Sequence, residues 1–243
     1  MEHSGRFLLK LSGEALTENG YRGIRRKPVD AIVREIKFVW PQYQIAVSVG
    51  GGNLYRGSQL TADLDLDPGD AVDADECGMV VTMVNGRMLT LMMRKAGIVA
   101  HHMMANPYPS MGEVFIMDKA VSRLAKGQVI VLSGGTGRPR VTTDTGAILS
   151  ALQIRADMVL KGTKVDGIYD SDPSKNPDAV RIPYISYEDF LKHDPPLRIL
   201  DTGAVSMARD NGLRIRVFNI FEPGALAQVL KGTGTYSEIG PAA

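Results

Sequence analysis

The sequence has very little of what marks a secreted or membrane-bound protein. Its 243 residues include a single cysteine, Cys77, which cannot form an internal disulfide, and this fits a reducing compartment. Met1–Arg6 lead into a short apolar stretch without a charged-then-apolar leader, and no uncharged apolar run approaches the ~18 residues that a membrane span needs. We therefore expect a cytoplasmic protein without a membrane segment.

The chain also has almost no net charge. Its 28 Lys and Arg residues are offset by 27 Asp and Glu residues, which gives a formal net charge of +1. This balance provides no general attraction to nucleic acid or to an anionic membrane, so we expect neither as a partner. Any phosphate group must then be held by a local arrangement of side chains and backbone amides.

Two widespread nucleotide-binding motifs are missing as well. The sequence contains neither the G-x-x-x-x-G-K-[ST] loop nor the dinucleotide motif G-x-G-x-x-G. His101 and His102 are adjacent, but no residues with metal-ligand spacing surround them. These absences disfavour two common nucleotide folds, and we expect no metal held by protein side chains alone.

What the sequence does contain is an alternation of strand and helix patterns. The predicted strands cover residues 7–11, 44–49, 98–103, 128–132, 157–161 and 215–219. The predicted helices cover residues 28–39, 79–97, 119–125, 144–155, 187–192 and 202–211, with a last helix from Pro223 and a further helix start at Asn53. Residues 61–76 carry seven acids without periodicity and are predicted as a surface loop, and Asp166-Gly167 is predicted as a hairpin turn.

This alternation predicts an α/β fold, a three-layer αβα sandwich with a mainly parallel central sheet. No long linker, internal repeat or low-complexity segment divides the chain, so we expect a single domain over residues 1–243. In such folds ligands bind beyond the carboxyl ends of the strands. The glycine-rich segments fall at these ends.

Two strand ends in the first half of the chain could hold phosphate groups. Lys10-Leu11-Ser12-Gly13 combines an ammonium group with small residues that let a phosphate approach, although an ordinary turn after an edge lysine has the same pattern. Gly50-Gly51-Gly52-Asn53 follows the second strand, with Arg56 just beyond it. Three glycines let backbone N–H groups crowd around an anion, and a guanidinium adds a two-pronged donor. The alternative is a flexible turn beside a solvated arginine.

Two further strand ends lie in the second half. Gly134-Gly135-Thr136-Gly137 precedes Thr142-Thr143-Asp144. Asp144 could be the N-cap of a helix and could also orient a lysine or a hydrated magnesium ion, and the two roles are compatible. Residues 161–169 begin with Lys161 and end with Tyr169, whose ring could stack on a purine, although the segment alone could be only a hairpin. Together the four strand ends indicate a nucleotide site.

Five segments, in the same order, resemble the bacterial-type uridylate kinases of the amino-acid kinase family. They are LLKLSGEAL at Leu8–Leu16, VGGGNLYRG at Val49–Gly57, GGTGRPRVTTDT at Gly134–Thr145, LKGTKVDGIYDSDP at Leu160–Pro173 and RVFNIFEPGAL at Arg216–Leu226. The resemblance extends over nearly the whole chain. It implies the amino-acid kinase fold, in which the N-terminal part binds the phosphate acceptor and the C-terminal part binds ATP.

The resemblance also implies an activity and a set of site residues. The activity is transfer of the γ-phosphoryl group of ATP to UMP, giving UDP and ADP in pyrimidine nucleotide biosynthesis, with Mg²⁺ accompanying ATP, in a homohexamer. The implied catalytic residues are Lys10 at the β and γ phosphates, Asp144 holding Lys10 in place, and Asp201 as a second carboxylate. The implied ATP-binding residues are Lys10, Leu11, Ser12, Gly13, Gly52, Arg56, Thr163, Tyr169 and Asp172. The implied UMP-binding residues are Gly51, Arg56, Asp75 (for the ribose), Thr136, Gly137, Arg138, Pro139, Arg140, Val141, Thr142 and Thr143.

These roles agree with the chemistry of phosphoryl transfer, in which the protein aligns two substrates and neutralises their charge without a covalent nucleophile. The sequence departs from the family where Arg138 and Arg140-Val141 replace the usual Asn and aromatic pair, so the base is less firmly predicted than the reaction. Two alternatives stay open. One is a kinase of the same fold that phosphorylates a carboxylate such as acetylglutamate or aspartate, and the other is a non-catalytic relative that binds nucleotides or oxyanions.

Overall fold

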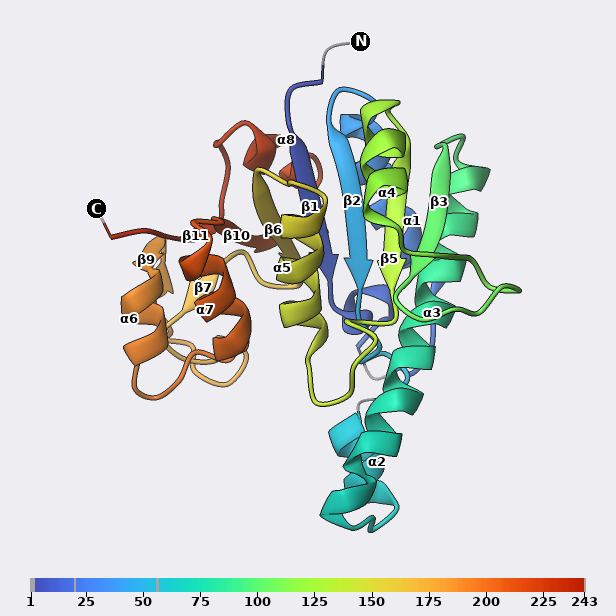
Figure 1. Ribbon diagram of the computed structural model, residues 1–243. Helices are drawn as coiled ribbons and strands as arrows, with labels where there is room; N and C mark the ends of the chain where they lie inside the picture. Colours follow the sequence, from blue (N-terminus) through green and yellow to red (C-terminus); the bar gives the residue numbers. More distant parts are fainter. Residues whose placement is uncertain (1–2, 20, 56, 243) are drawn as a thin grey trace.

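The computed structural model describes residues 3–19, 21–55 and 57–242. In this part of the chain, nine strands form one sheet in the order β4-β3-β5-β2-β1-β6-β10-β11-β9 (Figure 1). The strands are β1 Arg6–Leu11, β2 Gln44–Val49, β3 Ala100–Met104, β4 Glu113–Val114, β5 Val129–Ser133, β6 Met158–Thr163, β9 Tyr184–Ser186, β10 Ile215–Asn219 and β11 Ser237–Gly240. Neighbouring strands are parallel except for β10 and β11. The predicted, mainly parallel sheet is thus confirmed.

Helices cover both faces of this sheet. They are α1 Arg26–Val39, α2 Gly57–Asp63, α3 Ala71–Lys95, α4 Met117–Ala125, α5 Thr143–Gln153, α6 Tyr187–Lys192, α7 Thr202–Asp210 and α8 Ala225–Leu230, with short 3-10 helices η1 Gly13–Leu16 and η2 Pro68–Asp70. On one face α1, α3 and α8 pack against Leu9 and Leu11 of β1, and on the other α4, α5, α6 and α7 form a core that includes Leu8. Successive strand residues point to opposite faces. A strand between two helical layers is therefore buried on both faces, as β1 and β2 are from their second residue onward.

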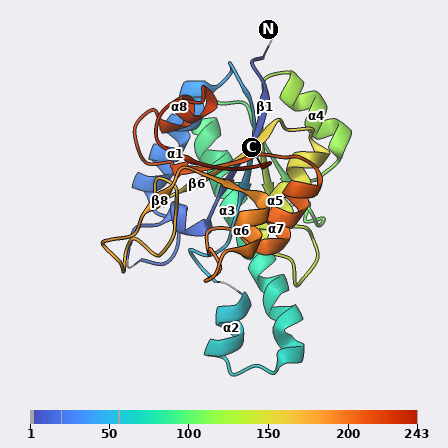
Figure 2. The same ribbon diagram turned by 90° about the vertical axis from the view of Figure 1, so that its left-hand side faces the viewer.

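The predicted loop over residues 61–76 is wrong, because most of it is helical. Helix α2 ends at Asp63, η2 follows, and α3 already begins at Ala71, eight residues before the predicted start at Met79. Figures 1 and 2 show α2 and the first part of α3 side by side, projecting beyond the sheet. This helical hairpin contacts little of the core, so its helices need no apolar periodicity. Acidic residues are also favourable near a helix N-terminus.

Several shorter features also differ from the predictions. Asp166-Gly167 does not join a hairpin, because β7 (Ile168–Tyr169) pairs with β8 (Arg181–Ile182) rather than with β6. The predicted helix start at Asn53 is a turn, and α2 begins at Gly57. None of the described helices combines the length and the apolar character that crossing a bilayer requires.

Candidate functional site

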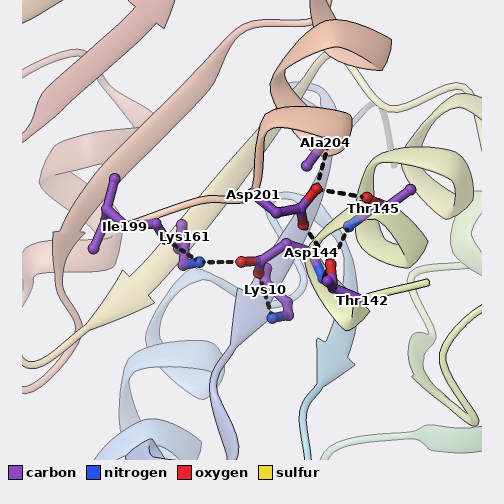
Figure 3. Close-up of polar contacts among 8 residues, drawn as sticks. All are labelled: Lys10, Thr142, Asp144, Thr145, Lys161, Ile199, Asp201 and Ala204. Atoms are coloured by element: carbon purple, nitrogen blue, oxygen red, sulfur yellow. Dashed lines mark hydrogen bonds and ion pairs between the residues drawn. The ribbon is translucent and has the colours of Figure 1, made fainter. Parts of the chain in front are cut away.

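The centre of the site is a carboxylate shared by two lysines from adjacent strands. Lys10 of β1 and Lys161 of β6 are partners in the parallel register, so their side chains leave the same face of the sheet. Lys10 Nζ lies 2.6 Å from Asp144 Oδ1, and Lys161 Nζ lies 2.7 Å from Asp144 Oδ2 (Figure 3). The side chains are only 4%, 8% and 17% exposed for Lys10, Lys161 and Asp144. A desolvated pair of this kind is weak evidence for stability, so a functional reason for it is favoured.

Burial and charge shift the acid–base properties of this group in opposing ways. Burial would raise the pKa of the Asp144 carboxyl, but the two ammonium groups outweigh it and lower that pKa to about 2. Burial is the largest influence on Lys161 and lowers the pKa of its ammonium to about 8, although Asp144 acts in the opposite direction. Asp144 is therefore ionised at neutral pH, while Lys161 is a cation close to its titration range.

Asp144 is oriented by the start of α5 without being its N-cap. Thr142 is the N-cap, and its hydroxyl accepts hydrogen bonds from the backbone N–H groups of Asp144 (3.1 Å) and Thr145 (3.2 Å). The N-cap reading of Asp144 is therefore wrong. Asp144 stands two positions beyond the N-cap, in the first turn of α5, and its carboxylate contacts the two lysines.

Asp201 joins the start of α7 to the start of α5. It is the N-cap of α7, accepting from the backbone N–H of Ala204 at 2.7 Å, and it also accepts hydrogen bonds from the hydroxyls of Thr142 and of Thr145, the latter at 2.9 Å (Figure 3). The structure thus brings Asp201 next to the segment that carries Asp144, while its predicted role as a second carboxylate near the phosphates stays a prediction. Its contacts are those of a group that orients the α5 N-terminus.

The turns after β1 and β2 meet beside this group. A Cβ atom on Gly13 would lie 2.4 Å from the backbone N of Gly52, and a Cβ on Gly50 would lie 3.3 Å from the Thr143 hydroxyl. The approach at Gly13 leaves no room for a side chain, and the one at Gly50 is tight. The turns and the N-terminus of α5 therefore converge, with backbone N–H groups of the kind that bind anions.

The loop after β5 closes against α3. Gly134, Gly135 and Gly137 have φ values of 82°, 58° and 71°, and Arg140 has a φ of 64°, all in the left-handed region. The backbone N–H of Arg140 donates to Asp75 Oδ2 at 2.9 Å. Asp75, distant in sequence, thus lies beside the loop that holds the predicted uracil contacts from Thr136 to Thr142.

The remaining predicted residues lie in several places. Thr163 ends β6, and its hydroxyl donates to the carbonyl of Val165 at 2.6 Å. Tyr169 and Asp172 belong to the segment around β7, where Tyr169 donates to Asp166 at 2.7 Å and Asp172 accepts from Ser174. The side chain of Leu11 is fully buried in the core, so only its backbone could contact a ligand. Arg56 lies outside the described residues.

Sequence reasoning missed Lys161 as a member of the central group. It noted a lysine at that strand end but assigned it no role. The available signal was a lysine at the matching position of two parallel strands, which becomes informative only once β1 and β6 are known to be neighbours. Among the described residues, no group of three His, Cys, Asp or Glu side chains could hold a metal ion.

The fold and the site together define a class of protein. It is an αβα protein whose candidate site lies at the carboxyl edge of a mainly parallel sheet, between buried lysines and glycine turns. A sequence model of the amino acid kinase family matches residues 5–219, and the chain belongs to this family.

Named relatives and solved structures agree with this assignment. The chain is 41% identical to the uridylate kinase of Rickettsia prowazekii (strain Madrid E), over 96% of this chain and 94% of the relative. It is 40% identical to the uridylate kinase of Xanthomonas oryzae pv. oryzae, over 93% and 92%. The crystal structure of UMP kinase from Bacillus anthracis superposes with a TM-score of 0.91 at 30% identity, covering 100% of this chain and 98% of that one. UMP kinase from Ureaplasma parvum gives a TM-score of 0.89 at 29% identity, covering 99% and 100%.

Proposed function

We infer that this protein is a UMP kinase, a phosphotransferase that moves the γ-phosphoryl group of ATP to UMP and forms UDP and ADP. The observation that carries the inference is the Lys10–Asp144–Lys161 group at the meeting point of the glycine turns. It provides buried positive charge where the phosphates of two nucleotides would meet. The named relatives, all uridylate kinases at about 40% identity, support UMP as the acceptor and do not favour the carboxylate-kinase alternative.

The chemistry follows from the donors that this group leaves available. Each ammonium has three N–H donors, and Asp144 takes one from each lysine. Lys161 gives a second to the carbonyl of Ile199. The remaining donors, with the backbone N–H groups of the turns, can neutralise charge on the transferred phosphoryl group. The transfer itself is an in-line displacement between the two substrates, so alignment is the main contribution of the protein.

The residue roles divide between the two substrates. On the ATP side we assign Lys10, Ser12, Gly13 and Gly52 to the phosphates, and Thr163, Tyr169 and Asp172 to the adenosine. On the UMP side we assign Gly51, Arg56 and Thr143 to the phosphate, Asp75 to the ribose, and Thr136–Thr142 to the uracil. Asp144 holds both lysines, and Asp201 orients the α5 N-terminus. In this division the acceptor is bound by residues up to Thr143 and the adenosine of ATP by the C-terminal part of a single domain, while the N-terminal turns also contact the ATP phosphates.

Mg²⁺ would enter with ATP. The donor set fits an ion held mainly by substrate phosphates, because Mg²⁺ usually takes one or two carboxylates, several waters and phosphate oxygens. Asp144 and Asp201, which contact the lysines and the start of α5, are the carboxylates that we propose would contribute. The ion would neutralise charge on the β and γ phosphates.

We also propose self-association, as a homohexamer, in the cytoplasm. Helix α3 carries four exposed apolar side chains at helical spacing, Val80, Val84, Met88 and Leu91, with exposures of 56%, 36%, 37% and 45%. Such a stripe on a long helix is typical of an interface with another subunit. The reduced state of the single cysteine in a reducing compartment fits a cytoplasmic enzyme.

The proposed function is tested by ADP release from MgATP with UMP, CMP, AMP, GMP, acetylglutamate or aspartate offered separately. We expect strong turnover with UMP alone, which would also show that Arg138 and Arg140 preserve the choice of uracil. Lys10→Ala is the matched control and should lose nearly all turnover while remaining folded. Activity with another acceptor alone would reject UMP and leave the family assignment intact.

A further inference from the structure

One edge of α3 contacts two glycine turns of the site, the turn after β2 and the turn after β5. Thr82 and Asn85 are three residues apart and therefore share a face of the helix. Both are buried, with exposures of 2% and 0%. Thr82 faces the turn after β5, and Asn85 faces the turn after β2.

Thr82 fixes the start of the turn after β5. Its hydroxyl accepts a hydrogen bond from the backbone N–H of Gly134 at 2.6 Å and donates to the carbonyl of Met79 at 2.7 Å. The hydroxyl proton is thus committed to the helix, and the oxygen is left as an acceptor for Gly134. Gly134 has a φ of 82°, so the chain changes direction at this bond.

Asn85 fixes the turn after β2 at both ends. Its amide nitrogen donates to the carbonyl of Gly50 at 2.7 Å and to Asn53 Oδ1 at 2.6 Å, while its oxygen accepts from Asn53 Nδ2 at 3.1 Å. Both N–H donors of Asn85 are therefore used. Asn53 also donates to the carbonyl of Gly23 at 3.0 Å, which joins a third segment to the same pair.

The turns also lie directly on the helix. A Cβ atom on Gly51 would lie 3.1 Å from Val81 Cγ1 and 3.2 Å from the carbonyl of Gly78. A Cβ on Gly86 would lie 3.0 Å from the side chain of Ser133, which precedes Gly134. These contacts leave no free space between the helix and the turns. Loss of the Thr82 hydrogen bond therefore displaces the turn after β5, and loss of the Asn85 hydrogen bonds displaces the turn after β2.

We propose that Thr82 and Asn85 are positioning residues that set the separation of the two glycine turns and so align the acceptor phosphate with the γ-phosphoryl group. The proposal rests on the UMP kinase activity inferred above. Alignment is the step most sensitive to small displacements, since a misplacement of about 1 Å can cost ~10²-fold in rate. Neither residue needs to touch a substrate for this role.

The test uses variants that keep the shape of each side chain. Thr82→Val removes the acceptor for Gly134 N–H, whereas Thr82→Ser keeps it. Thr90→Val is the matched control, because Thr90 is also on α3, is 0% exposed, and donates its hydroxyl to the carbonyl of Gly86 within the helix. Asn85→Asp keeps the size of the side chain and removes both donors. For each variant we would measure kcat, KM for UMP, KM for ATP and Tm.

We expect a split that a purely structural role would not give. Thr82→Val should raise KM for UMP by ~10-fold while KM for ATP stays within about twofold, since a buried donor is left unpaired on the acceptor side. Asn85→Asp should lower kcat by ~10- to 100-fold with smaller changes in either KM. Thr82→Ser should recover wild-type values, and Thr90→Val should match the wild type in kinetics whatever its Tm.

The positioning role is overturned if Thr82→Val and Thr90→Val have the same kinetic constants, or if each variant loses activity only in proportion to its folded fraction. Failure of the proposed function is a separate result, seen as a wild type that does not phosphorylate UMP. The same comparison made with the acceptor that the wild type does use would then still decide the positioning role.

Discussion

At the scale of single residues, the site depends on how one carboxylate is shared. Lys10 and Lys161 approach opposite oxygens of Asp144, so the carboxylate keeps two buried cations apart and in a fixed orientation. Removing it would leave like charges close together in a poorly solvated place. The same arrangement lowers the pKa of the Asp144 carboxyl, and burial lowers the pKa of the Lys161 ammonium.

The first prediction concerns activity at alkaline pH. Lys161 has a pKa of about 8, so above that pH it loses the charge that we assign to phosphate neutralisation. We expect kcat/KM to fall above pH 8, approaching tenfold per pH unit, because kcat/KM reports the free enzyme. The corresponding limb in kcat should lie at higher pH, since bound phosphates favour the ammonium.

Lys161→Arg is the control for this limb. A guanidinium does not titrate in the accessible range, so whatever activity the variant retains should be flat over the same pH interval. A wild-type profile that stays level to pH 9.5 would show that Lys161 is not the titrating group or has no part in catalysis.

The second prediction concerns acid stability. The folded pKa of Asp144 is lowered to about 2 from an unfolded value of 3.8. Stability from this group is therefore complete above pH 3.8 and is lost as the pH falls toward 2. Asp144→Asn should lower the free energy of unfolding at pH 7 by about 3 kcal/mol, because two buried ammonium groups lose their partner.

Urea unfolding at several pH values checks this. The difference between wild type and Asp144→Asn should be largest at neutral pH and shrink toward pH 2. A difference independent of pH down to pH 2 would mean that the carboxylate charge does not stabilise the fold. A wild-type unfolding curve at each pH supplies the reference.

At the scale of elements, the sequence predicts the regular core well. Strands β2 and β10 and helix α6 begin and end at the predicted residues. In the two strands, mainly apolar residues between polar turns leave little choice of boundary. The hairpin of α2 and the first part of α3 was missed because its acidic residues show no apolar periodicity, whereas the rest of α3 was predicted as the helix over residues 79–97. The short strands β4, β7, β8, β9 and β11 were missed because two to four residues form a strand only when a neighbouring strand is already in place.

The site was predictable to the extent that it depends on backbone. Gly13, Gly50 and Gly134 could be identified because glycines that directly follow predicted strands indicate tight turns and close approach of backbone or ligand. The partners of Asp144 could be found only in part. The resemblance supplied Lys10, whereas Lys161 depends on β6 lying beside β1, a fact of sheet order rather than of local pattern.

The third prediction concerns the turn after β1. In Gly13→Ala the new methyl group would lie 2.4 Å from the backbone N of Gly52, and neither backbone can yield without moving the other turn. We expect kcat/KM to fall by at least ~10-fold, because an alignment error of this size affects the transfer step directly.

Gly69→Ala is the matched control, because a Cβ at Gly69 meets nothing within 4 Å. It should have wild-type activity and a Tm within about 2 °C of wild type, as expected for a surface substitution that touches no special feature. Equal activity of the two variants would mean that the close approach of Gly13 and Gly52 has no role in the reaction.

At the scale of the whole molecule, the long helix α3 has two distinct faces. One supports the glycine turns, and the other bears the exposed apolar stripe of Val80, Val84, Met88 and Leu91. A contiguous stripe of this kind is poorly suited to permanent exposure to water. Helix α3 thus lies between the candidate site of its own chain and the surface that we propose contacts another subunit.

The fourth prediction follows from this stripe. Introducing charge into it, as in Met88→Glu with Leu91→Glu, should shift the protein to smaller species, because an apolar interface does not tolerate unpaired carboxylates. Sedimentation velocity measures the distribution. Phe38→Glu is the control, since Phe38 on α1 is 74% exposed and lies outside the stripe. An unchanged distribution in the double variant would place the subunit contacts elsewhere.

The bond between the Arg140 N–H and Asp75 has a consequence for the order of events in a catalytic cycle. One oxygen of the carboxylate that we assign to the sugar already accepts a hydrogen bond from the backbone of the neighbouring loop. If a ribose hydroxyl displaces that N–H, the loop loses a restraint at the moment the acceptor arrives. Amide hydrogen exchange at Arg140 would then be slower in the empty protein than with UMP bound. The exchange rate of this single amide would therefore report whether the acceptor is bound.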